Sequence, residues 1–199
     1  MGMHPMENTF VYRLWQAPFA ERKLQPFLRR TDLASVGRVL DVGCGPGTNA
    51  PHFRSCDYLG IDINPSYIRH AEKHFGPRFR VADVTTMSIE PGEGYDCILV
   101  NSLLHHLPNP AVARLLGHLA TLLSDAGAVH ILDLILPAGP SISRLLARMD
   151  RGRYPRPEEQ WRELFVAHFE PDVFEPYPLG AAGVTLWQMV YFQGRRRRQ

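Results

Sequence analysis

The glycine-rich segment at residues 41–47 constrains the fold of this chain more than any other stretch. It reads Asp-Val-Gly-Cys-Gly-Pro-Gly and directly follows the apolar pair Val39 and Leu40. Glycines at alternate positions predict a sharp turn at the end of a strand, because glycine adopts backbone conformations that other residues rarely reach. A turn with so few side chains lets a ligand lie against the backbone. The segment therefore predicts a strand that ends in a ligand-binding loop.

Acidic residues accompany this loop at informative spacings. Asp41 stands at its start, and Asp62 follows 21 residues later (62 − 41 = 21), where an apolar run ends. In doubly wound folds, an acid about 20 residues beyond the glycine loop lies at the end of the second strand and binds ribose hydroxyls. A dinucleotide would place its pyrophosphate over the loop, where the Asp41 carboxylate would repel it. The loop also lacks the G-x-G-x-x-G spacing of dinucleotide-binding folds. Together these features favour a nucleoside ligand that carries positive charge.

The loop and its acids resemble the first motif of class I S-adenosylmethionine-dependent methyltransferases, and the resemblance extends over about residues 36–193. S-adenosylmethionine carries an ammonium and a sulfonium but no phosphate, so it suits an acid at Asp41. The resemblance implies that Asp62 binds the ribose and that Ile63 covers the adenine. It also implies that Asp83 and the backbone of Val84 bind the adenine edge. The full set of cofactor-binding residues that it implies is Asp41, Gly43, Cys44, Gly45, Asp62, Ile63, Asp83, Val84 and Asn101. The expected product of the cofactor is S-adenosylhomocysteine.

The remaining sequence alternates strand and helix patterns, which is typical of an α/β protein. The strands after the loop are expected at 57–64, 79–84, 95–100, 128–134, 173–177 and 185–192. The helices are expected at 10–30 with interruptions at Pro18 and Pro26, and at 49–54, 66–75, 110–123 and 157–168. Only residues 178–184 join the last two strands, so these should pair antiparallel. We predict a doubly wound, seven-stranded, mostly parallel sheet with an antiparallel last strand and helices on both faces.

The expected catalytic end of the sheet begins at Asn101, which is followed by Ser-Leu-Leu-His-His. Enzymes of the family that methylate amines of nucleic acids or proteins carry Asn/Asp-Pro-Pro-aromatic here, so its absence argues against base N-methylation. The Leu-His-His segment resembles small-molecule methyltransferases instead. Histidine titrates near neutral pH, so His105 or His106 could take a proton from a hydroxyl acceptor. Asp133 ends the fifth strand and could orient the imidazole.

Between the two histidines we favour His105 as the base. Two alternatives stay open: a histidine that only hydrogen-bonds the backbone, and catalysis by proximity without a base. His105, His106 and Asp133 could approach one another, but they have no zinc-type spacing and form no carboxylate cluster. The three cysteines match no zinc or redox motif. We therefore expect no metal.

Two segments without a strict family pattern are candidates for covering the acceptor. One is an N-terminal helical cap at about residues 8–30, and the other is a lid-like insertion at about 137–156 with apolar residues at helical spacing. The insertion follows the carboxyl end of a strand, where doubly wound folds bind ligands. The plain alternative is a helix packed on the body with its arginines in water. The expected substrate or lid residues are Tyr12, Arg148, Arg151 and Tyr154.

Length and charge limit the remaining choices. The 199 residues fit one domain, expected at 1–194, with a basic tail at 195–199 that we expect to be disordered. The net charge is +2, and without four arginines of the tail it is −2 (+2 − 4 = −2), so no nucleic-acid surface is expected. The first eight residues are too short and polar for a signal peptide or a membrane span, which favours the cytoplasm. The sequence gives no oligomeric state.

The leading hypothesis is therefore methyl transfer from S-adenosylmethionine to a small organic acceptor, with O-methylation of a natural product or metabolite favoured over C- or N-methylation. One alternative is an RNA or protein methyltransferase, for which neither a basic face nor the amine-binding motif is seen. Another is a cofactor-binding protein of the same fold without methyl transfer, because a fold does not fix a function.

Overall fold

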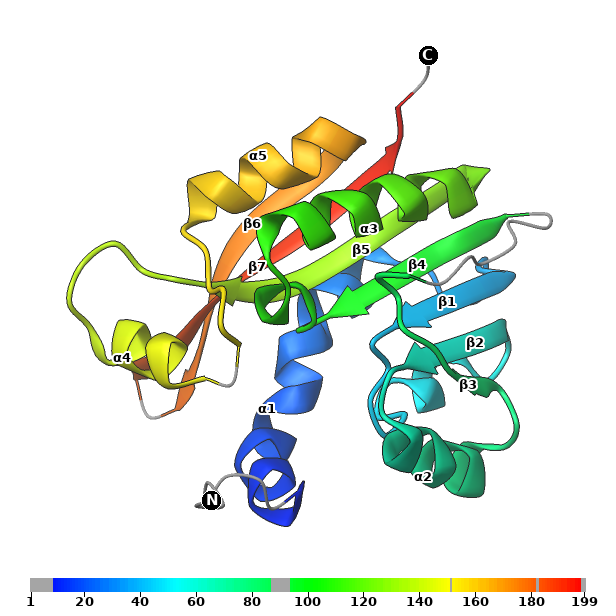
Figure 1. Ribbon diagram of the computed structural model, residues 1–199, viewed down its shortest axis with the longest axis horizontal. Helices are drawn as coiled ribbons and strands as arrows, with labels where there is room; N and C mark the ends of the chain where they lie inside the picture. Colours follow the sequence, from blue (N-terminus) through cyan, green and yellow to red (C-terminus); the bar gives the residue numbers. More distant parts are fainter. Residues whose placement is uncertain (1–8, 87–93, 151, 182, 198–199) are drawn as a thin grey trace.

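The computed structural model describes residues 9–86, 94–150, 152–181 and 183–197, with side chains from Phe19 onward. Its centre is a seven-stranded sheet in the order β3-β2-β1-β4-β5-β7-β6 (Figure 1). The strands are β1 (Arg38–Val42), β2 (Asp57–Asp62), β3 (Phe79–Val81), β4 (Tyr95–Asn101), β5 (Leu123–Ile135), β6 (Phe169–Ala181) and β7 (Val184–Arg196). The pairs among β1–β5 are parallel, and β7 is antiparallel to both β5 and β6. The predicted fold class is confirmed.

Helices cover both faces of this sheet. The helices and 3-10 turns are α1 (Thr9–Arg30), η1 (Ala50–Phe53), α2 (Pro65–Phe75), η2 (Leu104–His106), α3 (Asn109–Leu122), α4 (Ile142–Met149) and α5 (Glu158–His168). One hydrophobic cluster joins α3 and α5 to one face of the sheet, and a second joins α1, η1 and α2 to the other. Among the described helices, none is both long and apolar enough to cross a membrane.

Several boundaries differ from the sequence prediction for reasons of tertiary packing. Helix α1 runs unbroken through Pro18 and Pro26, although each proline removes one backbone donor. Leu24 and Phe27, with exposed fractions of 1% and 0%, anchor its second half in the core. The helix expected at 49–54 is a four-residue 3-10 turn.

The last hairpin is longer than predicted at both ends. Strands β6 and β7 are separated by two residues only, and β7 continues through Arg195 and Arg196. Arg195 pairs with Asp172 at 2.9 Å and Arg196 pairs with Asp125. These two arginines, which the sequence suggested would lie in a disordered tail, therefore belong to the sheet, while residues 198–199 lie outside the described part of the chain.

Helix α4 presents an unexpected face to solvent. The apolar residues with helical spacing that define the insertion include Ile142, Leu145 and Met149, which are 56%, 59% and 65% exposed. The helix instead buries Ser143 and Ala147. Small side chains on the inner face let α4 lie close to a third hydrophobic cluster, which contains residues of β5, β6 and β7.

Candidate active site

The glycine loop follows β1 and lies at the carboxyl edge of the parallel strands. Gly43, Gly45 and Gly47 have φ values of 72°, 55° and 83°, a region that favours glycine. A Cβ placed on Gly45 would meet nothing within 4 Å, so the space above the loop is open. The backbone N–H groups of Gly43 and Cys44 donate to the carbonyl of Ile61, which ties the loop to β2.

Carboxylates stand at the ends of the first two strands. Asp41 is fully buried, and its Oδ2 accepts hydrogen bonds from Asn49 Nδ2 (3.1 Å) and Tyr58 Oη (2.9 Å). Its Oδ1 is also buried, yet no described residue donates to it. Burial raises the pKa of Asp41 to about 6, against the lowering effect of the two hydrogen bonds. Asp62 accepts from the N–H of Gly45 at 2.9 Å, which fixes its carboxylate beside the loop.

These features fit a nucleoside with a cationic chain. The orphan oxygen of Asp41 calls for a donor that the described chain does not supply, and an amino acid ammonium would supply one. Ile63, directly after β2, is 65% exposed and leaves an apolar surface for a purine ring. Asp83 follows the third strand, and its Oδ1 accepts from both the N–H and the hydroxyl of Thr85. S-adenosylmethionine, with its adenine, ribose and amino acid parts, matches this set of groups.

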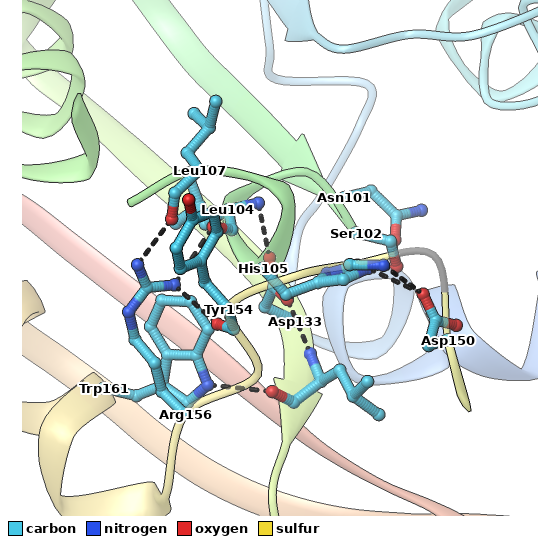
Figure 2. A network of polar contacts seen from close by, with 12 residues as sticks. Asn101, Ser102, Leu104, His105, Leu107, Asp133, Asp150, Tyr154, Arg156 and Trp161 are labelled. Atoms are coloured by element: carbon cyan, nitrogen blue, oxygen red, sulfur yellow. Dashed lines mark hydrogen bonds and ion pairs between the residues drawn. The ribbon is translucent and has the colours of Figure 1, made fainter. Parts of the chain in front are cut away.

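At the ends of β4 and β5, a buried imidazole lies between two carboxylates (Figure 2). His105 Nδ1 lies 2.6 Å from Asp133 Oδ1, and His105 Nε2 lies 3.3 Å from Asp150 Oδ1. Asp133 is fully buried and also accepts from the N–H groups of Leu104 and Leu134. Burial alone would lower the pKa of His105, but the charges and hydrogen bonds of Asp133 and Asp150 outweigh it and raise that pKa to about 9. His105 is therefore an imidazolium at neutral pH.

The imidazolium lowers the pKa values of both acids. Burial would raise their pKa values, but the hydrogen bond and charge of His105 outweigh it. The pKa of Asp150 falls to about 2, and the pKa of Asp133 falls below its usual range. The three groups form a charged triad in which one cation contacts two anions.

A buried arginine holds the backbone of this site in place. Arg156, 2% exposed, donates to the carbonyls of Leu104 (3.0 Å), Leu107 (2.6 Å) and Tyr154 (3.0 Å), as Figure 2 shows. Its guanidinium stacks over the ring of Trp161 at 4.6 Å. The N–H of Tyr154 in turn donates to the carbonyl of His105 at 2.9 Å. The segment after α4 is thus fastened to η2, and η2 carries His105.

A pocket opens beside the triad and encloses about 440 Å³ of empty space, part of it open to solvent. One end of the pocket is polar and is formed by Lys23, Ser102, His105 and Asp150. The other walls are Phe19, Leu134, Leu179, Trp187 and Met189. The pocket therefore lies between α1, η2, the end of α4 and the hairpin of β6 and β7.

Comparison with known proteins gives the family of the chain. A sequence model of a methyltransferase domain family matches residues 12–169. Trans-aconitate 2-methyltransferase of Escherichia fergusonii is 31% identical over 189 residues, which cover 87% of this chain and 69% of that protein. The chain belongs to the class I S-adenosylmethionine-dependent methyltransferase family.

Other relatives of this methyltransferase match it over different shares of their length. Trans-aconitate 2-methyltransferase of Methylobacterium nodulans is 32% identical over 121 residues, which cover 57% of this chain and only 45% of that protein. The crystal structure of the N-methyltransferase NodS of Bradyrhizobium japonicum in complex with S-adenosylhomocysteine superimposes with a TM-score of 0.68. It is 18% identical, and the match covers 89% of this chain and 87% of that one. This likeness concerns the fold.

The structure separates the residues that the sequence nominated for catalysis. His105 is 4% exposed and contacts Asp133, whereas His106 is exposed to solvent. Asn101 ends β4, and its Oδ1 accepts from the Ser102 hydroxyl at 3.2 Å. Cys44 lies in the loop with its thiol buried, and Val84 packs against the first hydrophobic cluster.

The nominated substrate and lid residues lie at the margin of the site. Arg148 is exposed on α4, and Tyr154 is 41% exposed beside η2. Neither belongs to the residues that line the pocket. Tyr12 lies on α1, but its side chain, like Arg151, is outside the described residues.

Three residues of the site were not identified from the sequence. Lys23 and Asp150 reach the pocket from segments that are far apart in sequence, and no motif marks either. Gly152 packs so closely on His105 that an added Cβ would lie 1.9 Å from the imidazole Cδ2. The only hint for Gly152 was its position in the Arg-rich segment after α4, where a glycine allows close approach.

The ligating atoms of His105, His106 and Asp150 also lie within 4.8 Å of one another, close enough to share a cation. A second carboxylate, Asp133, hydrogen-bonds Nδ1 of His105, as carboxylates commonly do with the non-ligating nitrogen of metal-bound histidines. The sequence led us to expect no metal here, and that expectation stays a prediction that a chelator can check.

Proposed function

We propose that this methyltransferase methylates an oxygen of a small organic acid that binds in the pocket beside His105. The observation that carries the proposal is the triad of His105, Asp133 and Asp150 at the polar end of that pocket. S-adenosylmethionine supplies the methyl group, which an acceptor oxygen takes with its own electron pair as S-adenosylhomocysteine leaves. For the cofactor we propose the residues that the family resemblance implies, with Asp41 and Asp62 as its main charged contacts.

The charge state of the triad argues against His105 as a general base, and an acceptor that is already ionised needs none. His105 keeps its proton because two carboxylates stabilise the imidazolium. An imidazolium cannot remove a proton from a neutral hydroxyl, and both ring nitrogens of His105 already contact carboxylates. A carboxylate acceptor needs no base, and the transfer then depends on orientation next to the methyl group. The trans-aconitate 2-methyltransferases that resemble this chain are named for an acid acceptor, which supports the same class.

The second candidate is O-methylation of a neutral hydroxyl with His105 as general base. The contact between His105 and Asp133 at 2.6 Å favours it, because a buried acid behind an imidazole is the arrangement of a catalytic triad. It requires that the bound acceptor displace the contact with Asp150 and lower the pKa of His105. The two candidates use the same residues. They differ in whether His105 keeps its own proton or takes one from the acceptor.

Matched acceptors test the proposal. The purified protein would be supplied with S-adenosylmethionine and with pairs of acceptors that share a body, such as benzoate with benzyl alcohol and trans-aconitate with its triol. We expect S-adenosylhomocysteine and a methyl ester, identified by mass spectrometry, with acids. Transfer to alcohols alone would support the second candidate. Calorimetric binding of the cofactor without any transfer would support a binding protein of this fold.

A further inference from the structure

Lys23 holds a distinctive position at the polar end of the pocket. It extends from the second half of α1, and its Nζ donates to the hydroxyl of Ser102 at 3.0 Å. Among the described residues this is its one hydrogen bond, and no carboxylate forms an ion pair with it. An ammonium has three donors, so the partly buried ammonium of Lys23, with a single neutral partner, still has donors free for an anion. Burial lowers the pKa of Lys23, and the charges of Asp150 and Asp133 offset only part of that effect.

A strained residue fixes where this ammonium points. Ser102 has φ of 58°, and it is the only described residue other than glycine with a positive φ. Such conformations persist where the surrounding structure holds them, often at functional sites. Ser102 donates to Asn101 Oδ1 at 3.2 Å, so its hydroxyl oxygen is left to accept from Lys23. This chain of hydrogen bonds places the ammonium at the carboxyl end of β4, next to the strand that carries the glycine loop.

The counter-ions at this end of the pocket are already engaged. Asp133 and Asp150 both contact His105, so the two carboxylates share the nearest cation. Among the described lining residues, Lys23 is then the cation that contacts no carboxylate, although the charges of Asp133 and Asp150 act on it from a distance. One acidic group can pair with it, but a second or third would meet Asp150 or a wall without a donor.

Those walls are apolar. Phe19 and Trp187 meet edge to face with ring centroids 5.2 Å apart. Leu134, Leu179 and Met189 are 3–4% exposed and complete the surface. Such a surface gains free energy by covering an aromatic or branched aliphatic body, and loses free energy when it covers an unpaired carboxylate.

We propose that Lys23 is the specificity-determining residue of the acceptor site, and that the acceptor is a monocarboxylic acid with an apolar body. This inference rests on the proposed function and narrows it. The acceptor that it predicts differs from the tricarboxylic acid after which the relatives of this chain are named. The single carboxylate binds the ammonium of Lys23, and the body lies against Phe19 and Trp187.

The test compares acids that differ in the number of carboxylates. Binding of benzoate, isovalerate and trans-aconitate to the protein loaded with S-adenosylhomocysteine would be measured by calorimetry, and methyl transfer to each by mass spectrometry. We expect benzoate or isovalerate to exceed trans-aconitate in both. Preference for trans-aconitate, or no binding of either monoacid at millimolar concentration, would overturn the inference. In the first case the proposed methylation of an acid would still stand.

Substitution of Lys23 supplies the second arm. Lys23→Met keeps the length of the side chain and removes the charge, so acceptor affinity should fall about 10- to 100-fold, as expected for a lost charge-assisted hydrogen bond. Affinity for S-adenosylhomocysteine should stay level, which also shows that the variant is folded. Lys73→Met, on the exposed surface of α2, is the matched control. Unchanged acceptor affinity in Lys23→Met would refute the role of Lys23.

Discussion

The proton on His105 determines how the polar end of the pocket acts on an acceptor. Imidazole ordinarily titrates near 6.5, and in this fold the pKa rises to about 9 because Asp133 and Asp150 stabilise the charged form. Between those pH values the folded protein holds a proton that an unfolded chain releases. The proton on His105 therefore adds its full stability below about 6.5, as long as both carboxylates stay ionised, and this stability is lost as the pH rises through about 9.

The same pKa gives opposite rate profiles for the two candidate functions. For an ionised acid, kcat/KM should stay flat near neutral pH and decline as the pH rises through about 9, because the imidazolium disappears. For a hydroxyl acceptor with His105 as base, kcat/KM should rise over the same interval. Initial rates of S-adenosylhomocysteine formation between pH 6 and 10 distinguish the two. The His105→Asn variant should lose the change of kcat/KM near pH 9, whether that change is a decline or a rise. If the change persists in the variant, it belongs to another titrating group.

Site residues that belong to a local sequence motif could be predicted. Site residues that reach the pocket from distant segments of the chain could not. Asp41, Asp62 and Asp133 end apolar runs, so the sequence alone placed them at the carboxyl edge of the sheet. Lys23 lies 79 residues from its partner Ser102, and no local pattern connects the two. The burial that separates His105 from its neighbour His106 likewise depends on the segment after α4, whose path the sequence did not specify.

At the scale of elements, the strands were predicted well because parallel strands buried on both faces read as continuous apolar runs. The prediction failed where tertiary packing overrides local preference. Two prolines argued for a break in α1, yet the burial of Leu24 and Phe27 keeps that helix in one piece. The apolar spacing in α4 predicted a helix correctly, but the helix buries its small residues instead.

The turn η2 owes its position to Arg156. Replacing Arg156 with Leu leaves the carbonyl of Leu107 without its one described donor and the carbonyl of Leu104 with the N–H of Leu107 alone. Unsatisfied buried acceptors are costly, so the free energy of unfolding should fall by about 2–4 kcal/mol. Urea denaturation followed by circular dichroism measures it. Turnover at saturating cofactor should also fall, because His105 is part of this turn.

Arg153→Leu is the control for this substitution. Arg153 belongs to the same segment but is exposed, so its replacement should change the free energy of unfolding by no more than about 0.5 kcal/mol. Equal destabilisation of the two variants would show that the hydrogen bonds of Arg156 do not support the turn.

At the scale of the whole molecule, the acceptor pocket exists only because opposite ends of the chain meet. Phe19 and Lys23 come from α1, whereas Leu179, Trp187 and Met189 come from the last hairpin. Several hydrogen bonds hold these parts together, and two of them lie close to Lys23. Tyr177 Oη donates to the carbonyl of Lys23 at 2.7 Å, and Arg22 donates to the carbonyl of Gly180 at 2.8 Å. The glycine loop and its acids lie elsewhere on the sheet edge and contain none of these contacts.

Loosening α1 should therefore weaken the acceptor site and leave the cofactor site intact. In the double variant Arg22→Ala and Tyr177→Phe, the acceptor KM should rise about 3- to 10-fold, as expected from two modest hydrogen bonds. Calorimetry should give an unchanged Kd for S-adenosylhomocysteine, and hydrogen exchange should become faster over residues 19–30. Arg29→Ala serves as the control, since Arg29 is 65% exposed and reaches Glu175 only at 3.8 Å. A parallel loss of cofactor affinity in the double variant would mean that α1 supports both sites, and that the two ligands are coupled through it.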